Sequence, residues 1–139
     1  MLATLEVMEE TRMPLVRISV KEGRTPNQQK VIADAVYHAM REALNVPEND
    51  RFQVVTEYAG DGLIYDPHYL GIERTDGIVF IHIFLRKGRT VEVKQAFYKR
   101  TAELLQEWAN VRPEDVLIAL TENDAADWSF GNGVAQYVP

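Results

Sequence analysis

The stretch Lys21-Glu22-Gly23-Arg24-Thr25 returns sixty-five residues later as Arg86-Lys87-Gly88-Arg89-Thr90, and this repeat decides the fold. A constant spacing through turns and helix-like segments alike is hard to obtain by chance, and it is typical of folds built from copies of one unit. The sequence therefore predicts a duplicated unit, over residues 14–58 and again over 77–123. The same spacing joins other identical pairs: Asn45-Val46 with Asn110-Val111, Asp50 with Asp115, and Thr56-Glu57 with Thr121-Glu122.

The first unit has the pattern of a strand, a helix and a second strand. Apolar and polar side chains alternate over residues 14–20, as in a strand with one buried face. Thr25 and Gln28 have the spacing of a capping box, so a helix is expected to begin after Thr25. Paired apolar residues recur every fourth position as far as Leu44, which indicates one buried helix face. Residues 51–58 are predicted to form the second strand.

The second unit repeats this order. Residues 78–85 are nearly all apolar, which predicts a central strand buried on both faces. Thr90 is expected to cap a helix in phase with the first, and residues 116–121 to form the fourth strand. The irregular stretch 59–76 is the connecting loop, and residues 124–139 are predicted to form a hairpin with a short strand over 134–138.

Together these elements predict an α/β (α+β two-layer) fold, in which one four-stranded sheet carries two helices on one face. Residues 14–139 are expected to be a single domain, and residues 1–13 an extension or sequence upstream of a true start at Met13. The helix-free face of the sheet would be bare, so we expect oligomerisation through it.

The composition excludes several classes of function. The net charge of −6 and the lack of a long basic patch argue against a nucleic-acid partner. There is no cysteine for a thiol nucleophile or a zinc–thiolate site, and the three histidines lack metal-ligand spacing. No apolar run approaches the ~20 residues of a membrane span. The acidic first twelve residues do not resemble a signal peptide, so a cytoplasmic protein is the default expectation.

Pro14, which follows a methionine at the head of the first strand, is the sharpest candidate for chemistry. Translation from Met13 followed by methionine removal would leave a free secondary amine that can act as base, acid or nucleophile. The alternative is an ordinary proline at the first residue of a strand, where proline is tolerated.

The repeated Gly-Arg-Thr turns supply the second set of candidates. Arg24 and Arg89 each lie between a strand end and a helix start, and Arg86 lies close to Arg89. Guanidinium groups pair bidentately with carboxylates, so such arginines favour a small carboxylate-bearing substrate; solvated turn arginines are the alternative. Asp50 and its counterpart Asp115 could each be a turn or cap residue, and that is what we expect of Asp115. Trp128 and Phe130 are either core residues or an aromatic wall over the substrate.

At this point the sequence resembles the tautomerase superfamily, and within it the malonate semialdehyde decarboxylase group. The resemblance runs from about Met13 to Tyr137. One departure is that Lys87-Gly88 separate two arginines that a single residue separates in the decarboxylase pattern. The matching motifs are Met13-Pro14, Glu22-Gly23-Arg24-Thr25, Val46-Pro47-Glu48-Asn49-Asp50-Arg51-Phe52, Gly88-Arg89-Thr90, and Glu122-Asn123 followed by Asp127-Trp128-Ser129-Phe130-Gly131.

The resemblance implies a cofactor-free enzyme that acts on a small oxo acid through an amino-terminal proline, and a homotrimer. It implies Pro14 as the amine, Asp50 as the polarising acid, and Arg86 and Arg89 as the carboxylate clamp. It further implies Trp128 and Phe130 as the aromatic wall, with Arg24 at a position that binds substrate in some groups. Decarboxylation, tautomerisation and hydration remain open, as does a catalytically silent trimer, since retention of residues 1–13 would make Pro14 an amide.

Overall fold

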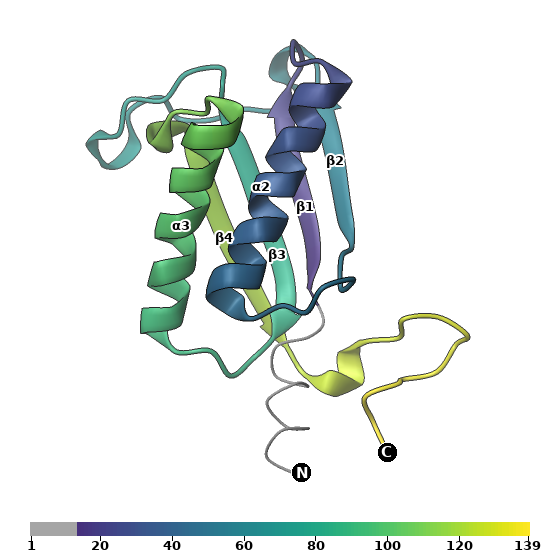
Figure 1. Cartoon of the computed structure of the whole chain (residues 1–139). Coiled ribbons are helices and arrows are strands. Elements are labelled where there is room, and N and C mark those ends of the chain that lie inside the picture. The colour runs from purple at the N-terminus through teal and green to yellow at the C-terminus, as the bar shows by residue number, and fades with distance from the viewer. Residues whose placement is uncertain (1–13) are drawn as a thin grey trace.

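The computed structural model describes residues 14–139, which form one four-stranded sheet with two long helices on one face (Figure 1). The first unit contains β1 (Leu15–Lys21), α2 (Pro26–Leu44) and β2 (Gln53–Tyr58). The second contains β3 (Val79–Arg86), α3 (Val91–Ala109) and β4 (Val116–Asn123). The strand order is β2-β1-β3-β4; the two strands of each unit are parallel, and β1 pairs antiparallel with β3. The predicted duplication and two-layer fold are confirmed.

The two helices begin and end in the same way. Thr25 accepts a hydrogen bond from the Gln28 amide at 3.1 Å, and the Gln28 side chain accepts one from the Thr25 amide at 2.8 Å. The Thr90 hydroxyl likewise caps α3. Each helix ends at an asparagine in the left-handed region, Asn45 at φ 54° and Asn110 at φ 53°. Asparagine tolerates this conformation well, so the repeated residue marks both helix ends.

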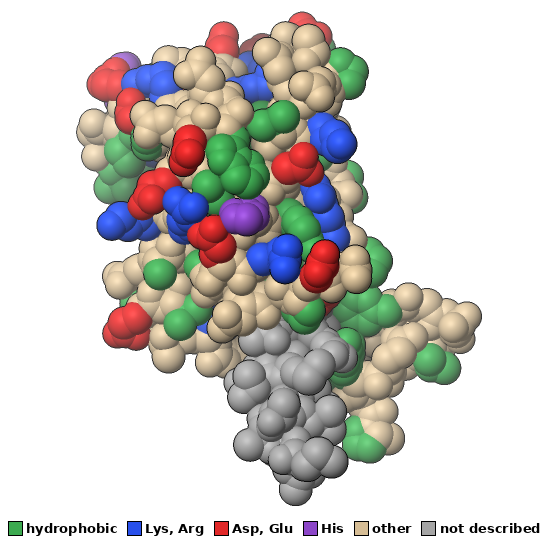
Figure 2. Space-filling view, in the orientation of Figure 1, with side chains coloured by type: hydrophobic (Ala, Val, Ile, Leu, Met, Phe, Trp, Pro, Cys, Tyr) green, Lys and Arg blue, Asp and Glu red, His purple; other side chains and the backbone are tan. Residues whose placement is uncertain are grey.

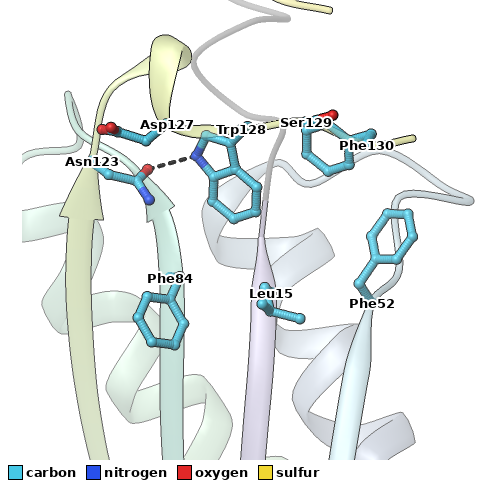
Figure 3. Close-up of a pocket in the computed structure, with 8 residues that line it drawn as sticks. All are labelled: Leu15, Phe52, Phe84, Asn123, Asp127, Trp128, Ser129 and Phe130. Carbon is cyan, nitrogen blue, oxygen red and sulfur yellow. Dashed lines mark hydrogen bonds between the residues drawn. The ribbon is translucent and has the colours of Figure 1, made fainter. Parts of the chain in front are cut away.

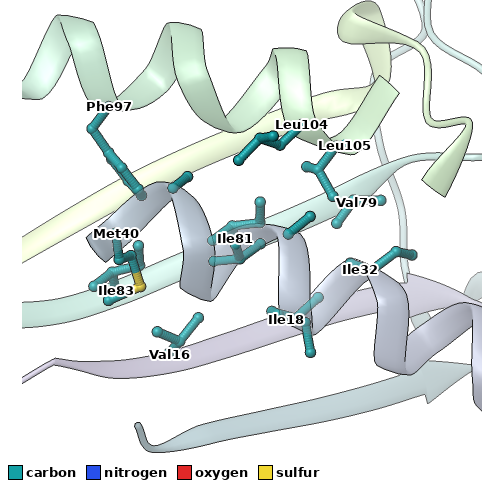
Figure 4. Packing of buried hydrophobic residues seen from close by; sticks show 14 of the residues in the cluster. Val16, Ile18, Ile32, Met40, Val79, Ile81, Ile83, Phe97, Leu104 and Leu105 are labelled. Atoms are coloured by element: carbon teal, nitrogen blue, oxygen red, sulfur yellow. The ribbon is translucent and has the colours of Figure 1, made fainter. Parts of the chain in front are cut away.

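The core lies between the helices and one face of the sheet (Figure 4). Phe97 of α3 is fully buried and is one of the largest side chains there. Figure 4 shows residues of both helices directed toward alternate residues of β1 and β3. Because the core draws on both units, neither unit has a hydrophobic core of its own. The core residues labelled in the figure are Val16, Ile18, Ile32, Met40, Val79, Ile81, Ile83, Phe97, Leu104 and Leu105.

The outward face of the two helices is charged and mixed in sign (Figure 2). One contact joins the helices there: the guanidinium of Arg100 in α3 donates to the carboxylate of Glu42 in α2. His38 also contacts Glu42, at 2.7 Å. The Arg100 hydrogen bond holds the pKa of Glu42 below its usual value. This surface pair therefore favours the folded state only while Glu42 is ionised.

The opposite face of the sheet carries no helix in the described chain. In β3 the residues alternate between buried and half-buried, so the prediction of burial on both faces is wrong for the single chain. The half-buried residues, among them Phe80, His82 and Phe84, lie on the helix-free face. Val54 of β2 and Leu117 of β4 are 44% and 42% exposed there.

The chain after β4 differs from the predicted hairpin. It forms a short 3₁₀ turn, Ala125–Asp127, and then runs without a strand over residues 128–139, so the predicted strand over 134–138 is wrong for the single chain. Hydrogen bonds of one side chain hold this segment in place of the backbone hydrogen bonds of a strand. The Gln136 side chain accepts from the Phe130 amide and donates to the Gly131 carbonyl, both at 2.8 Å. A strand needs a neighbour, and this segment instead runs past the strand ends and turns back on itself (Figure 1).

Candidate active site

One end of the sheet gathers most of the residues singled out in the sequence. Because β1 runs antiparallel to β3, its amino-terminal end lies beside the carboxyl ends of β3 and β4. The register pairs Leu15 with Phe84 and Arg86 with Asn123. Alternation along the strands puts Leu15, Phe84 and Asn123 on the helix-free face. This end of the sheet is therefore where the start of the first unit meets the end of the second.

A pocket of about 430 Å³ lies at this end (Figure 3). Its floor is apolar and comes from three strands or strand starts, with Leu15, Phe52 and Phe84. The segment after β4 lies across the strand ends and supplies the other side. A mostly apolar pocket with a few polar groups is the usual form of a small-molecule site. The full lining consists of Leu15, Phe52, Phe84, Asn123, Asp127, Trp128, Ser129 and Phe130.

Two stacked aromatic rings form the wall of this pocket. The Trp128 and Phe130 rings are nearly parallel, with an interplanar angle of 4° and centroids 5.2 Å apart. The Phe52 ring lies 5.7 Å from that of Phe130, and the Trp128 indole N–H donates to Oδ1 of Asn123 at 2.7 Å. The structure thus places both predicted wall residues in the pocket, where each ring is held by a neighbour.

Pro14 and Asp50 lie at the same end of the sheet. Pro14 directly precedes β1 and is buried. Asp50 is half-buried and comes just before β2, which runs parallel to β1. Asp50 lines a second hollow of about 290 Å³ together with Phe52 and Phe130, which also line the main pocket. The acid therefore adjoins the aromatic wall, and the proline lies next to Leu15 of the pocket floor.

Arg86 and Arg89 follow at the carboxyl end of β3. Arg86 is the last residue of that strand and has a buried Nη1 atom. The Arg89 guanidinium donates to two backbone carbonyls, of Arg86 at 3.2 Å and of Leu44 at 3.4 Å, and its Nε is buried. Arg89 thus ties the turn after β3 to the end of α2. Both arginines lie at the same end of the sheet as the apolar pocket and add positive charge there, although neither is among the residues that line the pocket.

Arg24 lies elsewhere. It follows the carboxyl end of β1, at the opposite end of the sheet, so within one chain it does not line the pocket. Its guanidinium donates to the Gly77 carbonyl at 2.8 Å. Burial lowers the pKa of Arg24, and the nearby charge of Asp115 partly offsets this. The surroundings of Arg24 are thus those of a structural residue within its own chain.

Asp115, the counterpart of Asp50, is also structural, as expected. It is 2% exposed, and its carboxylate accepts hydrogen bonds from the Thr75 amide at 2.7 Å and the Thr75 hydroxyl at 2.6 Å. These bonds fasten the end of the connecting loop to the start of β4. The two aspartates of the repeat therefore lie in different surroundings.

Six pocket residues were given no role from the sequence: Leu15, Phe52, Phe84, Asn123, Asp127 and Ser129. Strand alternation could have placed Leu15 and Phe84 on the helix-free face. Asn123 belongs to a motif that carried the resemblance, but its contact with Trp128 could not be foreseen, because it arises only when the chain folds back.

Two further properties bear on the kind of site. Within residues 14–139, no cluster of three or more His, Cys, Asp or Glu side chains could hold a metal ion. No helix in that part of the chain is both long and apolar enough to cross a membrane.

Comparison with known proteins identifies the family. Two family models described as "Tautomerase enzyme" match residues 50–131 and 14–72. The chain is 42% identical to probable tautomerase YusQ of Bacillus subtilis (strain 168) over 126 residues, which cover 91% of this chain and 99% of the relative. It is 37% identical to probable tautomerase YrdN of the same organism over 126 residues, covering 91% of this chain and 97% of that protein.

Solved structures agree with this result. A malonate semialdehyde decarboxylase structure is 36% identical with a TM-score of 0.84, covering 88% of this chain and 95% of its own. A second, the FG41 malonate semialdehyde decarboxylase inhibited by 3-bromopropiolate, is 42% identical with a TM-score of 0.84 and covers 88% and 93%. A fused 4-OT symmetric trimer, 22% identical with a TM-score of 0.71 and covering 86% and 94%, shares the fold. The chain belongs to the tautomerase enzyme family, and its relatives include the malonate semialdehyde decarboxylases.

Proposed function

We propose that this protein is a cofactor-free lyase that decarboxylates a small 3-oxo acid through the amine of Pro14, when Pro14 is the first residue. The observation that carries the proposal is the aromatic-walled pocket at the sheet end shared by Pro14, Arg86 and Arg89. An apolar pocket beside two guanidinium groups suits a small molecule with one carboxylate. The similarity to malonate semialdehyde decarboxylases favours that substrate class.

In this proposal the arginines bind and the proline activates. Arg86 and Arg89 hold the substrate carboxylate, and Asp50 favours the protonated form of the amine through its opposite charge. The cationic amine either polarises the aldehyde by a hydrogen bond or first gives up its proton and then adds, as the neutral amine, to the carbonyl carbon with loss of water to give an iminium ion. In either form the electron pair of the breaking carbon–carbon bond forms a double bond to the carbonyl carbon, the π pair of the C=O or C=N bond moves onto oxygen or nitrogen, and carbon dioxide leaves. Protonation of the resulting enol or enamine, with hydrolysis in the second case, gives the shortened aldehyde.

The aromatic wall is assigned to desolvation. Trp128 and Phe130 present stacked rings rather than hydrogen-bond donors to the pocket. A carboxylate against such a surface loses hydration, whereas neutral carbon dioxide does not need it. The wall therefore favours loss of carbon dioxide.

The test is a chain that begins at Pro14, incubated with malonate semialdehyde, with acetaldehyde release as the readout. The matched control is the chain that begins at Met1, in which Pro14 is a tertiary amide and cannot be protonated or add to a carbonyl. We expect activity from the first and none from the second. If the proline-first chain releases no acetaldehyde, the decarboxylase proposal is wrong.

The names of the curated relatives favour a second candidate, tautomerisation of an enol acid by the same residues, with hydration of an acetylenic acid as a variant. Base chemistry needs a neutral amine at pH 7, whereas decarboxylation and hydration need a cationic one. NMR titration of the Pro14 amine separates them. A pKa well below ~7 would favour the tautomerase, and one near ~9 the decarboxylase or hydratase.

A third reading is a catalytically silent protein in which residues 1–13 are retained. Intact-mass measurement of the protein from its own host decides this point. A mass that begins at Pro14 favours an enzyme, whereas a mass that includes Met1 favours the silent form.

We also propose that the helix-free face is the contact of a homotrimer. Val54 and Leu117 leave apolar surface exposed on this face, and sheet faces of this kind require cover. The fused 4-OT structure that shares the fold is described as a symmetric trimer. Because Leu15 and Phe84 of the pocket lie on the same face, a neighbouring subunit would also border the pocket.

A further inference from the structure

We propose that the side-chain amide of Asn123 donates a hydrogen bond to the substrate. It thereby selects acids that carry an oxo group in addition to the carboxylate. This inference rests on the proposed function, because it assigns Asn123 to the same substrate that Arg86 and Arg89 are proposed to hold. The arginines bind the carboxylate, and the amide nitrogen of Asn123 donates to the oxo group. Three observations carry the assignment: the orientation of the amide, its rigidity, and its neighbours.

The orientation follows from the chemistry of tryptophan. The Trp128 indole N–H is 2.7 Å from Oδ1 of Asn123, and an indole N–H only donates hydrogen bonds. The amide oxygen must therefore face Trp128, because the reverse orientation would set two donors against each other. The NH₂ group then has to face away from the indole. Figure 3 shows this nitrogen on the side of the Asn123 amide that faces Phe84 and the pocket floor.

The position of the donor is fixed at both ends of the residue. Asn123 is the last residue of β4 and is half-buried, and its backbone carbonyl accepts from the Lys87 amide at 2.9 Å. The indole that orients its side chain is stacked on Phe130, whose amide is bonded to Gln136. A donor held in this way loses little conformational entropy when it binds an acceptor.

The other polar residues of the pocket suit this role less well. Asp127 is exposed, and its carboxylate accepts from the Asp124 amide at 2.9 Å and has no proton to donate when ionised. Ser129 is exposed, and its hydroxyl can rotate. The NH₂ group of Asn123 is a neutral donor held in one orientation, which suits the neutral oxygen of a carbonyl group.

Asn123 also lies beside a proposed carboxylate-binding residue. The parallel register pairs it with Arg86, and alternation puts both residues on the helix-free face. Neighbouring strands are about 4.8 Å apart. A guanidinium and an amide at that spacing suit the carboxylate and the oxo group of one short oxo acid. The two groups would therefore be bound by side chains of the adjacent strands β3 and β4.

The test compares two ligands with the same carbon skeleton. Acetoacetate carries a 3-oxo group and butyrate lacks it. The ratio of their dissociation constants therefore measures how much a hydrogen bond to the oxo group contributes to binding. Calorimetric binding to the proline-first chain should give a preference for acetoacetate of about tenfold, the usual worth of one hydrogen bond. Asn123→Asp keeps an acceptor for Trp128 but removes the donor, and its charge repels both acids alike. The ratio should fall to about one.

Matched variants keep the result interpretable. Asn132→Asp makes the same change at an exposed loop residue and should keep the tenfold ratio. Trp128→Phe keeps an aromatic ring but frees the amide, and should reduce the ratio while butyrate still binds. A wild-type ratio in Asn123→Asp, or equal binding of both acids by the unsubstituted chain, would overturn the inference. A normal preference without acetaldehyde release from malonate semialdehyde would instead refute only the proposed function.

Discussion

Replacing Asp115 by alanine is expected to destabilise the fold by about 2–4 kcal/mol without loss of ligand binding at the pocket. The buried carboxylate accepts two hydrogen bonds from Thr75, at 2.7 and 2.6 Å. Bonds to a charged acceptor contribute ~1.5–3 kcal/mol each. Thr75 is exposed and can bond to water after the substitution, so part of the summed ~3–6 kcal/mol is recovered and about 2–4 kcal/mol is lost. Arg24, half-buried nearby, loses its counter-charge as well.

Thermal unfolding followed by circular dichroism measures this effect. At roughly 3 °C per kcal/mol for a chain of this size, the midpoint should fall by about 6–12 °C. Asp61→Ala, at an exposed aspartate, is the control and should shift it by less than about 2 °C. Ligand affinity, measured well below the midpoint, should be unchanged, because Asp115 precedes β4 at the end opposite the pocket. A fall of less than about 3 °C, or lost affinity in a folded variant, would refute this reasoning.

Three further predictions concern the core, the sheet face and the helix surface. Phe97→Ala, at a fully buried ring, should cost about 3–5 kcal/mol in urea unfolding, and a loss under ~1 kcal/mol would contradict the packing described. Leu117→Glu should dissociate the proposed trimer in light scattering, and an unchanged mass would exclude that strand from the contact. Glu42 has a depressed pKa because Arg100 donates to it, so its contribution to stability is complete above the unfolded-state pKa and is lost as pH falls through the folded-state pKa. Glu42→Gln should therefore lose less stability on acidification than the parent chain, and parallel pH profiles in denaturant titrations would contradict this.

The repeat made most of the fold predictable, because each copy carries its own signals for the start and the end of its helix. Thr25 and Thr90 begin the two helices, as the pattern indicated, and the repeated Asn45 and Asn110 end them. These signals are local, since a cap is formed by residues three or four positions apart. The exposed state of the second sheet face is not local, because it depends on what covers the sheet.

The candidate site was only partly predictable for the same reason. Trp128 and Phe130 were singled out by their motif, and both line the pocket. Asn123 is part of the same motif but was given no role, since its partner lies beyond a turn whose direction the sequence does not reveal. Arg24 and Arg89 look equivalent in the sequence, yet the antiparallel pairing of β1 with β3 sends them to opposite ends of the sheet. The two Gly-Arg-Thr turns therefore have different neighbours, because the two units lie antiparallel in the sheet.

The antiparallel arrangement of the two units also affects the start of the second unit. A polypeptide has one amino terminus, so joining two units end to end turns the start of the second into an interior segment. Here that segment is the end of the 59–76 loop, and Thr75 anchors it on Asp115. Two separate units would offer two chain starts and two open sheet ends. The fused chain has one chain start, and the corresponding segment of the second unit is a structural joint held by Thr75 and Asp115.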